Sequence, residues 1–537
     1  MPIHSPLLAS LTAIDNFVLL AYLAGMIGLG AYLSRRQRTE EEYFLAGRGM
    51  PWMAVGMSII ASLLSSLTYL SEPGEAWNSG VTHLTGKMLA IPIECAIVWT
   101  FCVPFMMRFK YTTAYEYLHD RFGIFPRRLG ATLFIAMVVL WMGFVVLASA
   151  RALSTVTGYS LLAVIVTVGV VATLYTVMGG LRAVIWTDVI QVVLLIGGGA
   201  FVIGYVAFET NTFLPDWYRA AEVHLAKAEQ PHSLPWFSFD PTMRATVVTV
   251  ALNMTVWHVC THVANQMTVQ RYFSTKDSVA ARRSFLTGAV FSVGINILLV
   301  AVGLALLYFY TQTGATLDAG LDPAQKSDRD LIFPTFAVSR LPAGFGGAIL
   351  AALLAAAMSS IDSGVNSIAT VVAIEKSATA EKPTSDRGEP GGRVREAQII
   401  TLIAGLFITI AAYCLSYLPS EWGIVDAMPR TFNAITAPLG GMFLVGMFIP
   451  RAGAKAVVAA TFLALTVSVS LGYLKQIGVL LVDSGLLSAP LPSISFTWIM
   501  PASLLTSIVS AALLSLLWPA TDEQRRRSYF AKGYAKS

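Results

Sequence analysis

The stretch LAALLAAAMSSIDSGVNSIATVV, residues Leu350–Val372, is long and apolar enough to cross a bilayer as a helix, for which about 20 residues suffice. Its middle is nevertheless polar. At 3.6 residues per turn, one stripe of the helix contains Ala356, Ser359, Asp362, Ser363 and Asn366. A carboxylate at the centre of a membrane helix costs about 3 kcal/mol on insertion scales, so such a group marks a functional site. Hydroxyls beside a carboxylate are hard oxygen ligands that suit an alkali cation. We therefore expect the chain to assemble around a cation bound by this helix, although close helix packing is an alternative explanation for its serines.

The composition of the chain is that of a polytopic membrane protein. Of its 537 residues 55% are hydrophobic and only 12% are charged, about half the charged fraction of soluble domains. The four cysteines lie in apolar runs without paired spacing, which suggests neither a disulfide framework nor a zinc site. No terminal segment is long enough for a soluble catalytic domain. We expect a protein embedded in the lipid bilayer, and neither an enzyme nor a nucleic-acid-binding protein.

Thirteen apolar stretches have the length of a membrane-spanning helix. We predict spans over Ile14–Leu33, Pro51–Trp77, His83–Met107, Leu129–Ser154, Leu161–Met178, Val184–Phe208, Ala245–Met267, Phe285–Tyr310, Ala343–Val372, Ala397–Leu418, Phe432–Ile449, Ala456–Tyr473 and Ser495–Leu517.

Basic residues are distributed unevenly over the loops between these spans. With the N-terminus outside, 26 of the 36 lysines and arginines, Arg271 among them, fall in cytoplasmic loops or the C-terminal tail, and nine fall in the opposite loops. Cytoplasmic loops of membrane proteins are enriched in Lys and Arg. We therefore predict an outside N-terminus, a cytoplasmic C-terminus and a plasma-membrane location, which in a bacterium is the inner membrane.

Polar residues interrupt the second span, PWMAVGMSIIASLLSSLTYLSEPGEAW (51–77), and Pro73-Gly74 precedes its end. Transporters use interrupted helices because unwound backbone carbonyls coordinate cations and half-helix N-termini attract anions. A serine-rich packing face explains this composition equally well. The span is thus a second candidate element of the cation site.

A second carboxylate lies near a membrane boundary in YTVMGGLRAVIWTDVIQ (175–191). Gly179-Gly180 predicts a tight cytoplasmic turn, and Asp188 follows with Gln191 one helical turn further on. An aspartate near the start of a helix is often a capping or surface residue. Together with Asp362 it favours a shared cation site.

Four segments together resemble the sodium:solute symporter family. Residues 175–191 resemble its best-known signature, through the paired glycines, the basic residue and Thr-Asp-x-x-Gln, and MSSIDSGVNSIATVV (358–372) resembles its sodium-binding helix. NQMTVQRYFSTKD (265–277) and APLGGMFLVGMFIPRAGAKA (437–456) resemble the ends of two later helices. The segments occur in the family's order, and the resemblance covers about residues 15–515.

The resemblance implies an all-α membrane protein of the leucine-transporter type, whose ten core helices form two inverted repeats of five. It implies an extra helix and a cytoplasmic loop in residues 1–50, the core in 51–450, and two helices with a basic tail in 451–537. It also implies alternating access, in which Na⁺ is the coupling ion and a small-molecule solute is transported with it.

In this family the main sodium site uses carbonyls of the broken first core helix and hydroxyls of the eighth. The resemblance carries that site onto Ala61, Leu64, Ala356, Ser359 and Ser360. A second sodium site, found in some members, maps onto Asp188, Ser359, Asp362 and Ser363. Asp362 stands where those members have a serine. This departure either strengthens the second site or admits a proton in place of Na⁺.

For the solute, the resemblance suggests as ligands Ser65, Thr68, Met88, Asn265 and Gln266. The acidic ligand of sugar-transporting members is missing, and Trp141 and Met142 stand where sialic acid transporters have an arginine. SLTYLSEPGEAW (66–77) looks more like the monocarboxylate, iodide and vitamin branch. We expect Na⁺-coupled symport of a small organic solute, preferably a monocarboxylate or another small anion. The alternatives are a Na⁺/sugar symporter and a proton-coupled carrier that uses Asp188 and Asp362.

Overall fold

The computed structural model describes residues 11–35, 37–227, 235–317, 320–379, 390–417 and 424–530. In these ranges the chain is helical. The first half contains α1 (Ala13–Ser34), α2 (Glu40–Leu45), α3 (Trp52–Leu63), α4 (Ser66–Ser79), α5 (Thr82–Ile97), α6 (Val103–Met106), α7 (Tyr115–Phe122), α8 (Ile124–Thr157), α9 (Leu161–Thr210), α10 (Leu214–Lys227) and α11 (Val247–Ala264). The second half contains α12 (Gln266–Phe273), α13 (Ser278–Gln312), α14 (Lys326–Arg340), α15 (Phe345–Thr379), α16 (Pro390–Leu415), α17 (Ile424–Phe448), α18 (Ala454–Gly472), α19 (Leu474–Asp483), α20 (Ile499–Leu514) and α21 (Asp522–Arg526).

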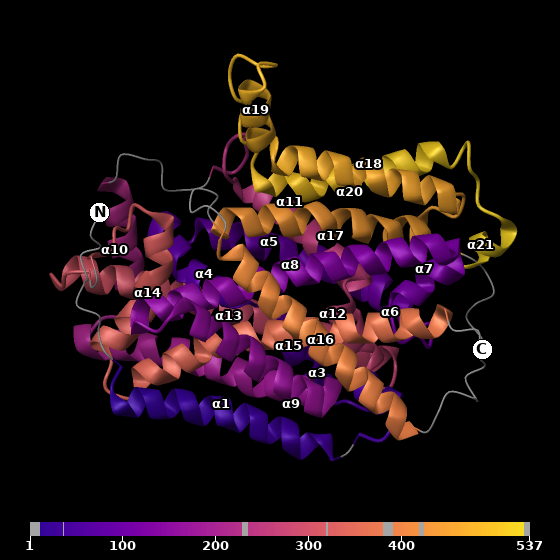
Figure 1. Cartoon of the computed structure of the whole chain (residues 1–537). Helices are drawn as coiled ribbons and strands as arrows, with labels where there is room; N and C mark the ends of the chain where they lie inside the picture. Colours follow the sequence, from indigo (N-terminus) through magenta and orange to yellow (C-terminus); the bar gives the residue numbers. More distant parts are fainter. Residues whose placement is uncertain are drawn as a thin grey trace.

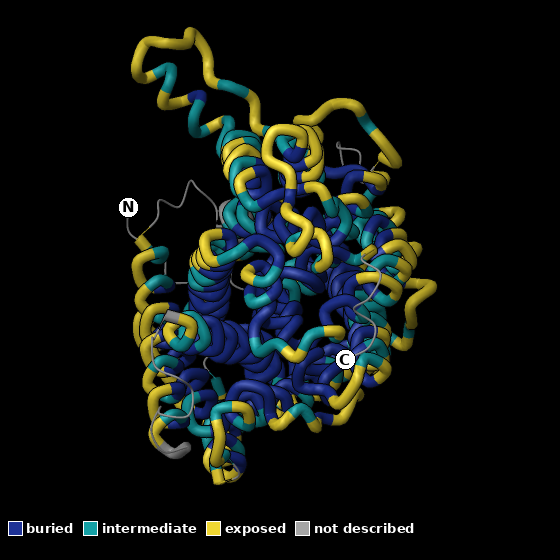
Figure 2. Tube along the Cα trace, turned by 90° about the vertical axis from the view of Figure 1, so that its right-hand side faces the viewer, coloured by how far each residue is buried: buried dark blue, intermediate teal, exposed yellow. Residues whose placement is uncertain are grey.

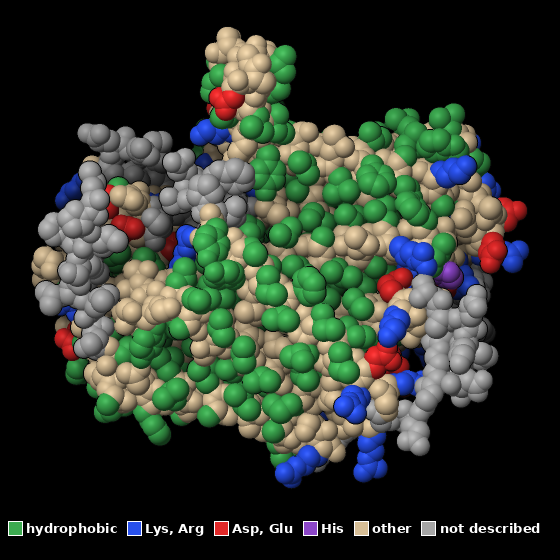
Figure 3. Space-filling model, viewed as in Figure 1, with side chains coloured by type: hydrophobic (Ala, Val, Ile, Leu, Met, Phe, Trp, Pro, Cys, Tyr) green, Lys and Arg blue, Asp and Glu red, His purple; other side chains and the backbone are tan. Residues whose placement is uncertain are grey.

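The long helices run in roughly the same direction through the molecule, and short helices cover its two ends (Figure 1). One end carries α10 and α14, and the other carries α7 and α21. Between the ends the visible surface is largely hydrophobic, whereas Lys and Arg side chains gather near α7 and α21 (Figure 3). An apolar belt between polar ends is the surface that a bilayer requires.

The predicted number of thirteen spans is not confirmed. In the described ranges eleven helices are long and apolar enough to cross a membrane, or up to twelve if the bent pair Glu40–Arg48 and Trp52–Leu63 counts as one span. Two departures explain the difference. The predicted second span is broken into α3 and α4, of 12 and 14 residues, and the predicted fifth and sixth spans are joined in α9.

The joint in α9 is Gly180, whose backbone is not helical (φ 51, ψ −158). Fifty helical residues would extend about 75 Å, more than twice the hydrocarbon thickness of a bilayer. A positive φ favours glycine, which explains the predicted turn at Gly179-Gly180. The turn therefore lies where the sequence predicts it, although helical residues flank it on both sides.

Helix α15, which carries the polar stripe, is the most buried of the long helices. In the most apolar 18-residue stretch of α15, 94% is buried, compared with 28% in the corresponding stretch of α1 at the periphery. Figure 2 shows the same contrast between a buried centre and an exposed outer layer. Helices α1, α3, α8, α9 and α16 pack around α15. The stripe thus lies in the protein interior and not against lipid.

The two helices predicted after the core correspond to α18 and α20, which pack against each other and against α17 at one edge of the molecule (Figure 1). The side of the membrane that each end faces stays a prediction, as does the division at residues 50 and 450. The basic residues Lys382, Arg387, Lys532 and Lys536, which contribute to the predicted orientation, lie outside the described residues.

Candidate functional site

The predicted interruption of the second span is a break between α3 and α4. Helix α3 ends at Leu63, and the next two residues have extended backbone conformations, with ψ of 97° at Leu64 and 168° at Ser65. Carbonyl groups in the last turn of a helix lack intrahelical donors, so they are available to other partners. Because Leu64 and Ser65 are both buried, these partners must come from within the protein. The break therefore exposes backbone oxygens in the interior.

Two hydroxyl groups of α15 face this break. Ser359 Oγ donates a hydrogen bond to the carbonyl oxygen of Ala61 at 2.9 Å, and Ser360 Oγ donates to that of Ser62 at 3.2 Å. Ser359 Oγ also lies 3.2 Å from the carbonyl oxygen of Ala356 on its own helix. A hydroxyl can rotate to offer its lone pairs instead of its hydrogen. These oxygens can therefore act together as ligands.

Four of the five residues predicted for the main sodium site line one small cavity. These four are Ala61, Leu64, Ala356 and Ser359. Its other lining residues, Gln191, Val192, Leu195 and Ile295, come from α9 and α13. Carbonyl and hydroxyl oxygens are the donors that a hard cation prefers. The composition of the cavity wall thus fits an alkali cation.

One of the two carboxylates predicted for the second site is paired with an arginine that was counted above among the cytoplasmic loop residues. Arg271 on α12 is fully buried, and its Nη2 lies 3.0 Å from Asp188 Oδ2 and 2.5 Å from Ser363 Oγ. Its Nε donates to Ser58 Oγ at 2.7 Å. The prediction that Arg271 lies in a loop is wrong. The prediction used only the position of each Lys and Arg between the spans, and this position does not reveal whether a side chain is buried. A carboxylate inside a membrane protein is costly without a cationic partner, so Asp188 was the sequence signal that pointed to a buried cation.

Asp362 completes this network from the other side. Its Oδ2 accepts hydrogen bonds from Tyr175 Oη at 2.7 Å and from Thr187 Oγ1 at 3.4 Å, while Ser363 Oγ donates to its Oδ1 at 3.1 Å. Within the described residues Asp188 Oδ1 has no hydrogen-bond partner. Two carboxylates and one guanidinium leave one negative charge in excess. One further cation or proton would therefore bring the net charge of this cluster to zero.

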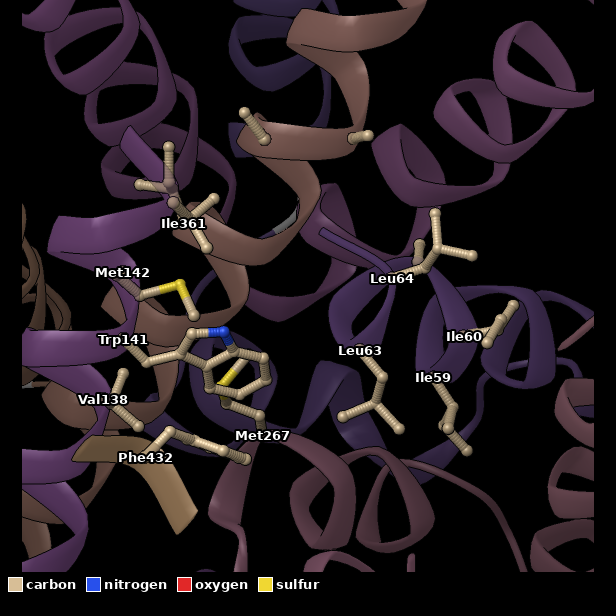
Figure 4. Packing of buried hydrophobic residues seen from close by; sticks show 14 of the residues in the cluster. Ile59, Ile60, Leu63, Leu64, Val138, Trp141, Met142, Met267, Ile361 and Phe432 are labelled. Atoms are coloured by element: carbon tan, nitrogen blue, oxygen red, sulfur yellow. The ribbon is translucent and has the colours of Figure 1, made fainter. Parts of the chain in front are cut away.

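A larger cavity of about 290 Å³ begins at the helix break. Its walls include three of the predicted solute ligands, Ser65, Thr68 and Met88, together with Trp141, Trp257 and Phe432. Figure 4 shows Leu63 and Leu64 at the end of α3, and Trp141 and Phe432 on the other side of the view. The lining also includes Arg244, whose side chain is 48% exposed, so the cavity reaches the surface.

The other two predicted solute ligands do not line this cavity. Asn265 is the residue between α11 and α12, where its side chain accepts a hydrogen bond from Met267 N at 3.0 Å. Gln266 accepts from Ala114 N at 2.8 Å and donates to the carbonyl oxygen of Thr112 at 2.9 Å. In this structure Asn265 therefore caps α12, and Gln266 holds the segment before α7 against α12.

A broken helix that faces hydroxyls on a buried helix, beside a cavity that reaches the surface, is typical of membrane carriers with a midplane site. The model described as the sodium:solute symporter family matches residues 43–463. The chain belongs to the sodium:solute symporter family. It is a Na⁺-coupled solute symporter and not an enzyme.

Individual relatives cover most of this chain. The sodium/sialic acid symporter SiaT of Proteus mirabilis is 32% identical, over 83% of this chain and 86% of that protein. The sodium/sialic acid symporter NanT of Aliivibrio fischeri is 31% identical, over 83% and 85%. The human sodium/iodide cotransporter is 29% identical, over 85% and 69%.

Solved structures show the leucine-transporter type of fold. A Na⁺-coupled sialic acid symporter in a substrate-bound outward-open state has a TM-score of 0.79 and 28% identity, and the match covers 95% of this chain and 99% of that chain. The transporter Mhp1 has a TM-score of 0.53 at 12% identity, with 90% and 97% covered, which shows a shared fold alone. The predicted fold class and coupling ion are thereby confirmed.

Proposed function

We propose that this protein uses Na⁺ bound between α3 and α15 to drive the uptake of a small organic anion across the plasma membrane. The ligands are the carbonyl oxygens of Ala61, Leu64 and Ala356 and the hydroxyl oxygens of Ser359 and Ser360. The observation that carries this proposal is the 2.9 Å contact between Ser359 Oγ and the carbonyl oxygen of Ala61 at the helix break.

The proposed coupling follows from the place of the break. Na⁺ at this site would tie α3 to α15 and fix the start of α4, which lines the larger cavity. Ion and solute must then raise each other's affinity by the same factor. One net charge that crosses the membrane releases about 2.3 kcal/mol per 100 mV. One Na⁺ with a monovalent anion moves no net charge, so the membrane potential drives uptake only when more than one Na⁺ accompanies the anion.

We further propose that Asp188, Ser359, Asp362 and Ser363 hold a second cation next to Arg271. The excess negative charge of the cluster supports this proposal, because a buried uncompensated charge is unfavourable. A proton on Asp362 would compensate the same charge. This observation favours a proton as the alternative occupant of the second site, and uptake would then depend on pH as well as on Na⁺.

An anionic solute is supported by the relatives, several of which are named for sialic acid, iodide or monocarboxylates. The narrower expectation of a monocarboxylate is not favoured. The human sodium-coupled monocarboxylate transporter 1 is 28% identical, whereas the two sialic acid symporters are 32% and 31% identical. We therefore propose the broader class of organic anions, with a neutral sugar as the alternative.

The test combines Na⁺ binding with uptake. Purified protein is titrated with Na⁺, and with K⁺ for comparison, in a thermal-shift assay, and proteoliposomes are assayed with labelled sialic acid, lactate and glucose. Ser359→Ala and Ser360→Ala should raise the Na⁺ concentration required in both assays. Ser367→Ala removes a buried hydroxyl of the same helix that bonds Gln270 at 3.1 Å, and it should leave Na⁺ dependence unchanged. Normal Na⁺ dependence in both site variants would contradict the assignment.

A further inference from the structure

A pair of opposite charges lies inside the larger cavity. Lys87 on α5 donates a hydrogen bond to Oε1 of Glu72 on α4, and its Nζ lies 3.4 Å from Asn296 Oδ1 on α13. The side chains of Lys87 and Glu72 are only 15% and 6% exposed, and both line the cavity. The pair thus connects three helices around the space that begins at the helix break.

Glu72 has a carboxylate oxygen to which no residue in the described part of the chain donates. Within the described residues its Oε2 is buried and has no hydrogen-bond partner, whereas Oε1 receives Lys87 and lies 4.0 Å from Nε2 of His83. Rotation of the carboxylate exchanges the two oxygens, so either can be presented to the cavity. The Lys87 ammonium has three hydrogens, of which one remains beyond its bonds to Glu72 and Asn296. The pair can therefore accept and donate one further hydrogen bond.

A purely structural salt bridge explains this arrangement less well. Buried ion pairs contribute little to stability, because their desolvation offsets their attraction. The surrounding walls are mostly apolar and include Trp141, Trp257 and Phe432. A few polar groups in a mostly apolar cavity are typical of a ligand site, where they fix the orientation of the ligand.

We propose that Lys87 and Glu72 form the recognition pair for a solute that carries both a carboxylate and a nitrogen-borne hydrogen. Lys87 binds the carboxylate, the unused acceptor of Glu72 receives the N–H group, and the aromatic walls receive the rest of the solute. An α-amino acid and an N-acylated acidic sugar both have this chemistry. The inference rests on the proposed function, since it defines the solute class of the same cavity.

The first test compares four probes on the purified full-length protein in Na⁺, by solute-dependent thermal shift. Phenylalanine carries both groups, 3-phenylpropionate lacks the amine, and phenethylamine lacks the carboxylate. N-acetylneuraminic acid carries a carboxylate and an acylated nitrogen on a sugar, so its binding compared with that of phenylalanine distinguishes an acidic sugar from an amino acid as the solute. We expect a solute with both groups to bind, and the solutes with one group to bind at least about tenfold more weakly.

The second test changes the pair. Lys87→Met and Glu72→Gln should each weaken binding of the two-group solute by roughly 10- to 100-fold. The double variant Lys87→Met/Glu72→Gln leaves no unpaired charge, so it should fold and still bind weakly. Arg127→Met is the matched control. It breaks another largely buried pair, Arg127 with Glu375 at 2.5 Å, outside the cavity lining, and it should leave solute affinity unchanged.

Equal binding of phenylalanine and 3-phenylpropionate would overturn the inference, as would wild-type affinity in the double variant or no binding of any probe. A titration with Na⁺ alone separates this inference from the proposed function. If Na⁺ stabilises the protein in a Ser359-dependent manner while the pair variants bind normally, only the recognition pair is rejected. If Na⁺ has no effect, the proposed function itself is rejected.

Discussion

Nη2 of Arg271 lies 3.0 Å from Oδ2 of Asp188, and neither side chain reaches the surface. The same nitrogen donates to Ser363 Oγ at 2.5 Å, so one guanidinium joins α9, α12 and α15. A fixed positive charge therefore occupies one side of the proposed second cation site. It neutralises one carboxylate permanently, and only the charge of Asp362 is left for a mobile ion.

Removal of the arginine should destabilise the protein. Arg271→Gln leaves Asp188 buried and unpaired, which typically costs about 3–5 kcal/mol in the free energy of unfolding. The measurement is the thermal midpoint of the detergent-solubilised variant. The double variant Arg271→Gln/Asp188→Asn should recover part of the loss, since no charge remains unpaired. A double variant that is no more stable than Arg271→Gln would show that this pair does not govern stability.

Asp362 should determine how many cations accompany the solute. In Asp362→Asn the cluster has one carboxylate for one guanidinium, so a second Na⁺ has no charge to compensate. We expect the Na⁺ dependence of uptake to lose its cooperativity, with a Hill coefficient near one. Asn366→Ala, on the same stripe of α15, is the control and should keep the wild-type coefficient. If Asp362→Asn abolishes a pH dependence and leaves Na⁺ cooperativity intact, the carboxylate carries a proton.

The turn at Gly180 should not tolerate a side chain. Its φ is +51°, and a Cβ atom there would lie 2.6 Å from the carbonyl oxygen of Tyr43. Gly180→Ala should lower the free energy of unfolding by about 1–3 kcal/mol. Gly197→Ala is the matched control in the same helix, because a Cβ there meets nothing within 4 Å. Equal thermal midpoints for the two variants would contradict this account of the turn.

Close packing between α13 and α4 should affect solute binding. A Cβ at Gly303 would overlap the carbonyl oxygen of Pro73 and lie 2.7 Å from the side chain of Ala76. Gly303→Ala should destabilise the protein by about 1–3 kcal/mol and weaken solute binding, because the displaced α4 lines the cavity. Thermal shift with and without solute measures both effects. Gly294→Ala, where a Cβ meets nothing within 4 Å, should change neither.

The sequence by itself determined the class of fold and indicated the two helices of the proposed sodium site. A long apolar run with a polar stripe can lie only in the interior of a membrane protein, because lipid does not solvate carboxylates or hydroxyls. This reasoning predicts the buried α15 and places Ser359 and Asp362 on its functional face. Interrupted apolarity likewise indicates a break within residues 51–77, although a packing face explains that composition equally well; its position at Leu64 and Ser65 comes from the structure. Both signals are local, so the order of apolar and polar residues reveals them, whereas the predicted ligands of the sodium site came from the family resemblance.

Only the tertiary structure decided which groups from distant segments meet. Arg271 has the sequence context of a loop cation, yet it is buried against Asp188, 83 positions away. Lys87 and Glu72 are assigned to different spans by the sequence, and Gln266 resembles a solute ligand until its bonds to Thr112 and Ala114 are seen. Periodicity fixes the face of a helix on which a side chain lies. The partner on another helix depends on how the helices pack and on the free-energy cost of leaving a buried charge unpaired.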